Sequence, residues 1–197
     1  MIRINNIKIY KDISGEELLQ SVITKYKIQK ENIIEWHISK KSIDARKKED
    51  VHYSYSIDIC TKNEEKLLKY KDVSLIKNLE QPQIELNLNK SVRPIIIGAG
   101  PSGLFAALTF IKYGYKPIVI EQGQQVEERK KSVDNFINAG ILNTNSNVQF
   151  GEGGAGTFSD GKLTSGINSP YCKTVLEEFV KFGAPEQILY LTKPHIG

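Results

Sequence analysis

Three glycines between two apolar runs mark the middle of the chain. Residues 93–121 read RPIIIGAGPSGLFAALTFIKYGYKPIVIE, so the β-branched run Ile95–Ile97 leads directly into Gly98, Gly100 and Gly103. The isoleucine run predicts a short strand of a parallel sheet, buried on both faces. The glycine spacing suits a tight turn, an unobstructed approach of the backbone to a pyrophosphate, and close packing of the next helix. We therefore expect a unit that holds the ADP half of a dinucleotide.

The residues after the glycines continue this pattern. A helix should begin near Pro101, which tolerates a first turn because its missing N–H would be unpaired there. Gly114 is a candidate C-terminal cap, and residues 117–120 predict a second strand. Glu121 follows, where a carboxylate accepts hydrogen bonds from ribose hydroxyls and disfavours the 2′-phosphate of NADP. The residues expected on the buried helix face are Leu104, Ala107, Leu108 and Ile111.

Two other interpretations of the glycines stay open. The spacing occurs by chance in turn-rich loops. A short-chain dehydrogenase would space its glycines differently and require a downstream Tyr-x-x-x-Lys pair, whereas the pair in this chain, Tyr26 and Lys30, lies upstream. The strand, helix, second strand and acid together favour dinucleotide binding.

A second glycine-rich segment, QFGEGGAGTFSDGKL, spans residues 149–163. Loops with so little side-chain bulk let backbone N–H groups approach an anion or a flat ring. Residues 156–162 resemble a phosphate-binding Walker A loop, but Leu163 replaces the hydroxyl residue that binds Mg²⁺. A flexible surface loop is the plainer alternative.

The run VQFGEGGAGTFSDGKL (148–163) resembles a signature of a group of bacterial FAD-dependent dehydrogenases that are distantly similar to glutathione-reductase-type flavoproteins. The segments GAGPSG (98–103), VEER (126–129) and SIDARKK (42–48) are similar to the same group, so the resemblance covers nearly the whole chain. It implies FAD as the cofactor, with NAD(P)H as a candidate electron donor, and it assigns no catalytic residue.

The resemblance also implies site residues. Glu121 would hold the adenosine ribose, and Arg129 would reach the cofactor phosphates or the adenosine side. Gln122 stands where such proteins often carry arginine. The residues expected to face the pyrophosphate or approach the flavin are Gly98, Gly100, Pro101, Ser102 and Gly103 in the first loop and Gly153, Gly154, Ala155, Gly156, Thr157 and Phe158 in the second.

Composition limits the remaining function classes. The chain has 197 residues, 25% of them charged, and a formal net charge of +4, which disfavours nucleic acid as the main partner. It shows no long apolar run, so we expect a cytoplasmic protein without a membrane partner. Cys60 and Cys172 are far apart, and the three histidines have no metal-ligand spacing, so we expect neither a disulfide redox centre nor a metal site.

Glycine usage divides the chain. Gly15 is the only glycine before residue 91, so we expect an N-terminal domain (1–90) and a second domain (91–197). The first should be a ferredoxin-like α+β sandwich with the order β-α-β-β-α-β, and the second an incomplete Rossmann-like FAD-binding domain. The expected elements of the first domain are strands at 2–10, 33–39, 51–60 and 84–88, a helix capped by Ser14 and Glu17, and a short helix at 63–70. In the second domain we expect one helix from Val126 to near Gly140. A second helix should run along Val175, Leu176, Phe179 and Val180 and end at Gly183 and Pro185.

The basic segment 40–48 leaves three alternatives open: a solvated loop, a docking surface for an acidic partner or the rest of a flavoprotein, and an RNA-binding loop. The chain carries no late glycine–aspartate segment or substrate domain. We therefore expect the N-terminal part of a longer enzyme, weak or absent FAD binding by the isolated chain, and no turnover. A separate chain that carries the missing half is a candidate partner. The alternative function is a non-catalytic dinucleotide-binding or partner-docking module.

Overall fold

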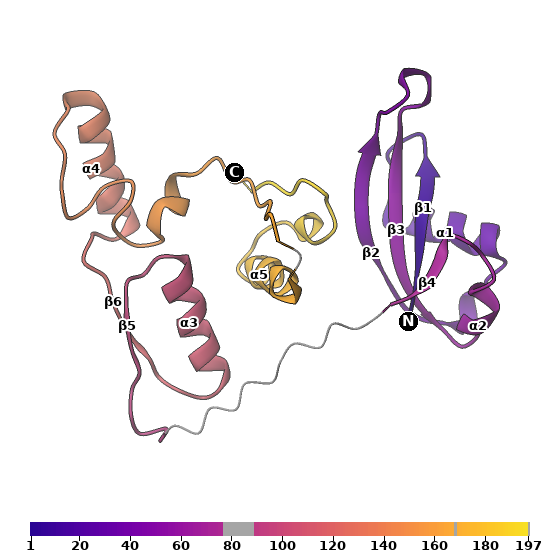
Figure 1. Ribbon diagram of the computed structural model, residues 1–197, viewed down its shortest axis with the longest axis horizontal. Coiled ribbons are helices and arrows are strands. Elements are labelled where there is room, and N and C mark those ends of the chain that lie inside the picture. The colour runs from indigo at the N-terminus through magenta and orange to yellow at the C-terminus, as the bar shows by residue number, and fades with distance from the viewer. Residues whose placement is uncertain (77–88, 168, 197) are drawn as a thin grey trace. The chain divides into compact units, whose positions relative to one another are not determined.

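The computed structural model describes residues 1–76, 89–167 and 169–196, and the chain has a mixed α/β fold (Figure 1). It divides into two compact units, residues 1–81 with 162–197, and residues 82–161. The expected domain boundary lay at residues 90 and 91, whereas the structure groups the segment from Lys162 onward with the N-terminal unit. The strand expected at 84–88 lies outside the described residues.

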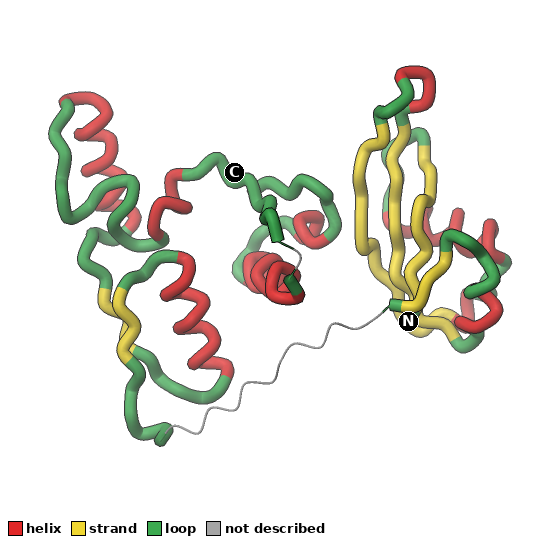
Figure 2. The backbone as a smooth tube through the Cα atoms, viewed as in Figure 1, coloured by secondary structure: helices red, strands yellow, loops and turns green. Residues whose placement is uncertain are grey.

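The first unit is built on a four-stranded antiparallel sheet in the order β2-β3-β1-β4. Figure 2 shows these strands side by side. Tyr55, Ile57 and Ile59 of β3 are buried in the apolar core, and the intervening Ser56 and Asp58 are buried as well. The strands are β1 (Ile2–Ile9), β2 (Ile33–Asp44), β3 (His52–Thr61) and β4 (Val73–Leu75).

Two helices cover one face of this sheet: α1 (Gly15–Tyr26) and α2 (Glu64–Leu67) (Figure 1). The Ser14 hydroxyl accepts the Glu17 N–H, and the Glu17 carboxylate accepts the Ser14 N–H, which confirms the predicted capping box. Leu18 and Val22 of α1 join the buried strand side chains in one apolar core. Short 3₁₀ turns η1 (Lys30–Asn32) and η2 (Lys48–Asp50) flank β2 and β3.

Strand β2 is longer than expected. We predicted a loop from Lys40 onward, but β2 continues to Asp44, because each residue from Lys40 to Asp44 pairs with β3. Only residues 45–51 form the hairpin tip. Val51, expected as the first residue of the strand at 51–60, lies in this tip and is 48% exposed. The charged side chains of segment 40–48 suggested a loop, but the pairing of residues 40–44 with β3 extends the strand through the first part of this segment.

The C-terminal part of the first unit meets the edge of β2. It contains α5 (Pro170–Lys181) and the 3₁₀ turn η4 (Glu186–Leu189). The Lys41 N–H donates to the Tyr190 carbonyl at 2.7 Å, and the Thr192 N–H donates to the Lys41 carbonyl at 3.1 Å. The positive φ of Gly183 (101°) ends α5 where the glycine and proline signals predicted.

The second unit contains a two-stranded parallel sheet of β5 (Ile95–Ile97) and β6 (Ile118–Ile120), joined by α3 (Pro101–Lys112). The predicted order of strand, helix and strand is confirmed. Gly140 adopts a left-handed conformation and caps α4 (Val126–Ala139), as expected. The 3₁₀ turn η3 (Gly154–Phe158) completes the unit.

The predicted burial of these elements is wrong. Ile95 and Ile97 are 62% and 79% exposed, and on α3 Leu104 and Ile111 are 41% and 57% exposed. A parallel strand is buried on both faces only when further strands and helices cover it. Within the described residues, β5 and β6 have each other and α3, so their other surfaces remain open.

Candidate functional site

The first glycine loop is fixed by backbone contacts at the end of β5. The Gly98 N–H donates to the Ile120 carbonyl at 2.7 Å, which ties the loop to β6. Gly98 has a φ of 97°, a conformation that favours glycine. A Cβ on Gly103 would lie 2.0 Å from the Gly98 carbonyl oxygen, so only glycine allows α3 to pack this closely. The first and third glycines therefore have the roles that their spacing predicted.

The second glycine of the motif faces open space. A Cβ on Gly100 would meet no atom within 4 Å. Gly100 is the N-cap of α3, and Pro101 is its first residue. The N–H groups of the first turn, at Ser102 and Gly103, have no acceptor within the helix, because a helix leaves its first donors unpaired. This helix end can receive an anion through N–H groups and the helix dipole.

Glu121 lies at the carboxyl end of β6 and organises both sides of this loop. Its carboxylate accepts the Ala99 N–H at 2.6 Å and the Gly123 N–H at 2.9 Å. These two backbone hydrogen bonds lower the pKa of Glu121, so the side chain is an anion at neutral pH. The sequence predicted a ribose acceptor at this position, but it did not predict that the same carboxylate would hold the glycine loop.

The second glycine loop packs directly against the first. The Gly153 N–H donates to the Ala99 carbonyl at 2.9 Å. A Cβ on Gly154 would lie 3.1 Å from the Pro101 ring and 3.3 Å from the Gly100 Cα. Gly153 and Gly154 both have positive φ values, 80° and 63°. The structure therefore brings together two segments that the sequence placed some fifty residues apart.

Arg129 is the buried centre of the second loop. Its side chain is 0% exposed, and burial lowers the pKa of its guanidinium. It donates at 2.5–2.8 Å to four main-chain carbonyls, those of Asn147, Val148, Glu152 and Gly154, and at 3.4 Å to the Thr157 hydroxyl.

These bonds involve all three guanidinium nitrogens, and five N–H donors are all that arginine has. Arg129 therefore has no donor left for a phosphate, and the role expected from the resemblance changes. Its carbon Cζ lies 4.9 Å from the centre of the Phe158 ring. The residue holds the loop in shape, and no sequence signal predicted this role beyond the place of Arg129 in VEER.

Glu152 also positions a helix. Its carboxylate accepts the Val126 N–H at 2.9 Å and so satisfies a free donor in the first turn of α4. The Glu152 N–H donates to the Gln124 carbonyl at 3.1 Å. Gln122 is exposed. The remaining expected site residues of this loop are the exposed Ala155, Gly156 and Thr157 and the half-buried Phe158, all within η3.

Two other kinds of site were sought in the described ranges 1–76, 89–167 and 169–196. Among these residues, no group of three histidines, cysteines or acids could hold a metal ion. Their helices are all too short or too polar to cross a membrane.

The chain is similar to a family model and to a known protein. Residues 1–60 match the model of a domain of unknown function, DUF8436. The chain is also similar to an uncharacterized protein of Clostridium beijerinckii, with 46% identity over 200 residues. The match covers 100% of this chain and 38% of that protein. The chain thus spans well under half the length of this relative.

Proposed function

We propose that the chain is the N-terminal part of an FAD-dependent oxidoreductase and that its second unit binds the ADP and pyrophosphate part of FAD. The observation that carries this proposal is the arrangement around Gly100. A parallel strand pair, a glycine turn, an open helix N-terminus and an ionised carboxylate meet at one point. Each of these features has a defined role in dinucleotide binding.

The residues present fit the adenine-side half of this cofactor. The open space in front of Gly100 lets a pyrophosphate approach the backbone, where a side chain would block it. Gly98 and Gly103 shape the turn, and the free N–H groups at Ser102 and Gly103 face the phosphate charge. Glu121 retains acceptor capacity for ribose hydroxyls, because each carboxylate oxygen accepts more than one hydrogen bond. Bound FAD would supply hydride and electron transfer through its flavin ring.

The strand topology supports two finer assignments. The strand order β2-β3-β1-β4 with antiparallel neighbours supports our assignment of the first unit to a ferredoxin-like α+β sandwich. The parallel β5-α3-β6 connection supports our assignment of the second unit to the first part of a Rossmann-like domain. In the second assignment, further strands would continue the sheet beyond the two described ones.

The open surfaces of β5 and β6 limit what the isolated chain can bind. Ile95 and Ile97 are mostly exposed, and a two-stranded sheet buries too little apolar area to be rigid. The relative from C. beijerinckii has a further 62% of its length beyond the matched part. We infer that additional residues, in the same chain or in a partner chain, cover this surface and contact the flavin. The alternative, a non-catalytic dinucleotide-binding or partner-docking module, predicts a stable unit without them.

A pair of glycine variants tests the proposal. Gly100→Ala adds a methyl group into open space, so it should leave the fold unchanged and block the pyrophosphate. Calorimetric titration with ADP should show weak binding to the parent chain, weaker binding of adenosine, and a loss of ADP binding on the order of tenfold or more in Gly100→Ala.

Gly166→Ala is the matched control. A Cβ on Gly166 also meets no atom within 4 Å, and Gly166 lies outside the proposed site. Equal ADP binding by the parent chain and Gly100→Ala would refute the proposed site. A purified chain with a stoichiometric flavin spectrum would refute the expectation that the isolated chain holds FAD weakly.

A further inference from the structure

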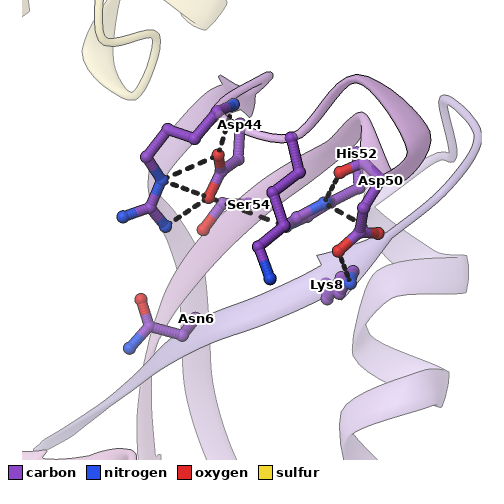
Figure 3. Close-up of a pocket in the computed structure, with 8 residues that line it drawn as sticks. Asn6, Lys8, Asp44, Asp50, His52 and Ser54 are labelled. Atoms are coloured by element: carbon purple, nitrogen blue, oxygen red, sulfur yellow. Dashed lines mark hydrogen bonds and ion pairs between the residues drawn. The ribbon is translucent and has the colours of Figure 1, made fainter.

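A polar hollow lies at the tip of the β2–β3 hairpin, outside the dinucleotide site. It has a volume of about 590 Å³. Figure 3 shows side chains from three strands and the hairpin tip around it. The lining residues are Asn6 and Lys8 of β1, Asp44 of β2, His52 and Ser54 of β3, and Arg46, Lys47 and Asp50 of the tip.

The two carboxylates of this hollow are already engaged. Asp44 accepts two side-chain nitrogens of Arg46, Nε at 2.9 Å and Nη2 at 2.5 Å, together with the Arg46 N–H. Asp50 accepts the Lys8 ammonium at 2.6 Å and the Tyr10 hydroxyl at 3.0 Å. Bonds to Arg46 and to Lys8 lower the pKa of Asp44 and of Asp50, respectively, so both carboxyl groups stay ionised at neutral pH.

His52 is also oriented. Its side chain is 12% exposed, and its Nδ1 lies 2.7 Å from the Asp50 carbonyl oxygen, a geometry in which Nδ1–H is the donor. The opposite nitrogen, Nε2, lies 3.9 Å from an Asp44 oxygen. The ring is thus held between the two acidic residues, as Figure 3 shows.

Several hydrogen-bond donors of the hollow, in contrast, are available to a ligand. In the described part of the chain, no ion pair or side-chain hydrogen bond engages the Lys47 ammonium, the Asn6 amide or the Ser54 hydroxyl. The Nη1 group of Arg46 is also outside the bonds that Arg46 makes to Asp44. A ligand that fits must therefore supply acceptors, and it must tolerate a positive local charge.

Asn6 gives a second sign of a built site. It has a φ of 54°, a left-handed conformation that is uncommon for a residue other than glycine. It stands where the β1–β3 register shifts between Ile4 and Ile7. Bulges of this kind redirect a side chain, and they are frequent beside binding sites.

We propose that this hollow binds a phosphate-type oxyanion, either free phosphate or the terminal phosphate of a nucleotide. Lys47 and the outer edge of Arg46 supply charge, and Asn6 and Ser54 supply neutral donors. Asp44 and Asp50 act as positioning residues, because they hold Arg46, Lys8 and His52 in place. This site is independent of the dinucleotide cradle in the second unit.

The test compares two adjacent lysines. Lys47 lines the hollow and Lys48 does not, so Lys47→Met and Lys48→Met remove the same charge at neighbouring positions. Amide ¹H–¹⁵N spectra of the full chain would be recorded at constant ionic strength during titration with inorganic phosphate, AMP and adenosine. Phosphate and AMP should shift the amides of Asn6, Lys47 and Ser54, and adenosine should not.

Lys47→Met should weaken phosphate binding on the order of tenfold, and Lys48→Met should change it less than twofold. Equal weakening in both variants would overturn the site in favour of diffuse attraction by the basic hairpin. Shifts caused by adenosine as strongly as by AMP would also overturn it. An unchanged spectrum in all three titrations would exclude the site, because folding is verified by the same spectra.

Discussion

Replacing Arg129 tests how the second glycine loop is held in place. Arg129→Met keeps an apolar stem of similar length and removes all five donors. It would leave the carbonyls of residues 147, 148, 152 and 154 without their present partner. Hydrogen bonds to a charged group contribute about 1.5–3 kcal/mol each, but the exposed parts of the loop can turn to water. We therefore expect a loss of about 3–5 kcal/mol from the free energy of local opening.

Hydrogen exchange followed by mass spectrometry measures this loss directly. Each 1.4 kcal/mol is a factor of about ten, so 3 kcal/mol raises exchange in residues 147–157 about a hundredfold. Arg129→Lys, with three donors instead of five, should give an intermediate effect. The single tryptophan, Trp36, packs against the core of the first unit, so its fluorescence should report an unchanged urea midpoint.

Lys130→Met is the matched control. Lys130 is the next residue of α4 and is exposed, and its replacement by methionine removes the same charge as Arg129→Met does. If the amide hydrogens of residues 147–157 exchange at the same rate in Arg129→Met and in Lys130→Met, the reasoning that places Arg129 at the centre of the loop is wrong.

Three further predictions concern single contacts. Gly103→Ala should destabilise the second unit by about 1–3 kcal/mol, because the new Cβ would lie 2.0 Å from the Gly98 carbonyl oxygen. Hydrogen exchange of α3 should therefore be faster in Gly103→Ala than in Gly100→Ala, and equal rates in the two variants would count against this reasoning. Ser14→Ala should lower the free energy of unfolding of the first unit by about 1 kcal/mol, measured by urea unfolding followed by Trp36 fluorescence. Ser21→Ala should lower it less, because the Ser21 hydroxyl donates to the Leu18 carbonyl of its own helix and caps no helix end. The lowered pKa of Glu121 should stabilise the second unit at every pH above the pKa of the unfolded chain, about 4.3. That contribution should disappear as the pH falls through the lower folded-state value, and Glu121→Gln should remove this pH dependence of exchange at Ala99 and Gly123.

Local signals in the sequence predicted the local structure well. The Ser14–Glu17 capping box, the Gly98–Gly103 turn and the left-handed Gly140 each depend on a few neighbouring residues. Their geometry follows from backbone sterics and from donors that a helix end leaves free, so a single sequence contains enough information.

Burial was not predictable in the same way. The run Ile95–Ile97 indicated a strand covered on both faces, yet two of its side chains are mostly exposed. An apolar run indicates that a strand has side chains suited to burial, but the elements that cover those side chains come from elsewhere in the chain or from outside it. The pairing of Lys41 with residues 190–192 was missed for the same reason, because contacts between distant segments leave no local pattern.

The candidate site shows both cases. Its glycines and Glu121 follow a spacing that the sequence displays. The resemblance implied that Arg129 reaches the cofactor phosphates or the adenosine side, whereas its four carbonyl partners lie in the folded loop and leave no local pattern in the sequence. The packing of Gly154 against Pro101 and Gly100 likewise depends on the folded loop.

Amide hydrogen exchange with and without ADP tests the central claim most directly, because it reports where in the chain the ligand acts. The account predicts slower exchange in residues 98–104, 121–123 and 153–158 when ADP is present at millimolar concentration, and no such change in Gly100→Ala. Exchange in these three segments that is the same with and without ADP, or that slows equally in Gly100→Ala, would contradict it.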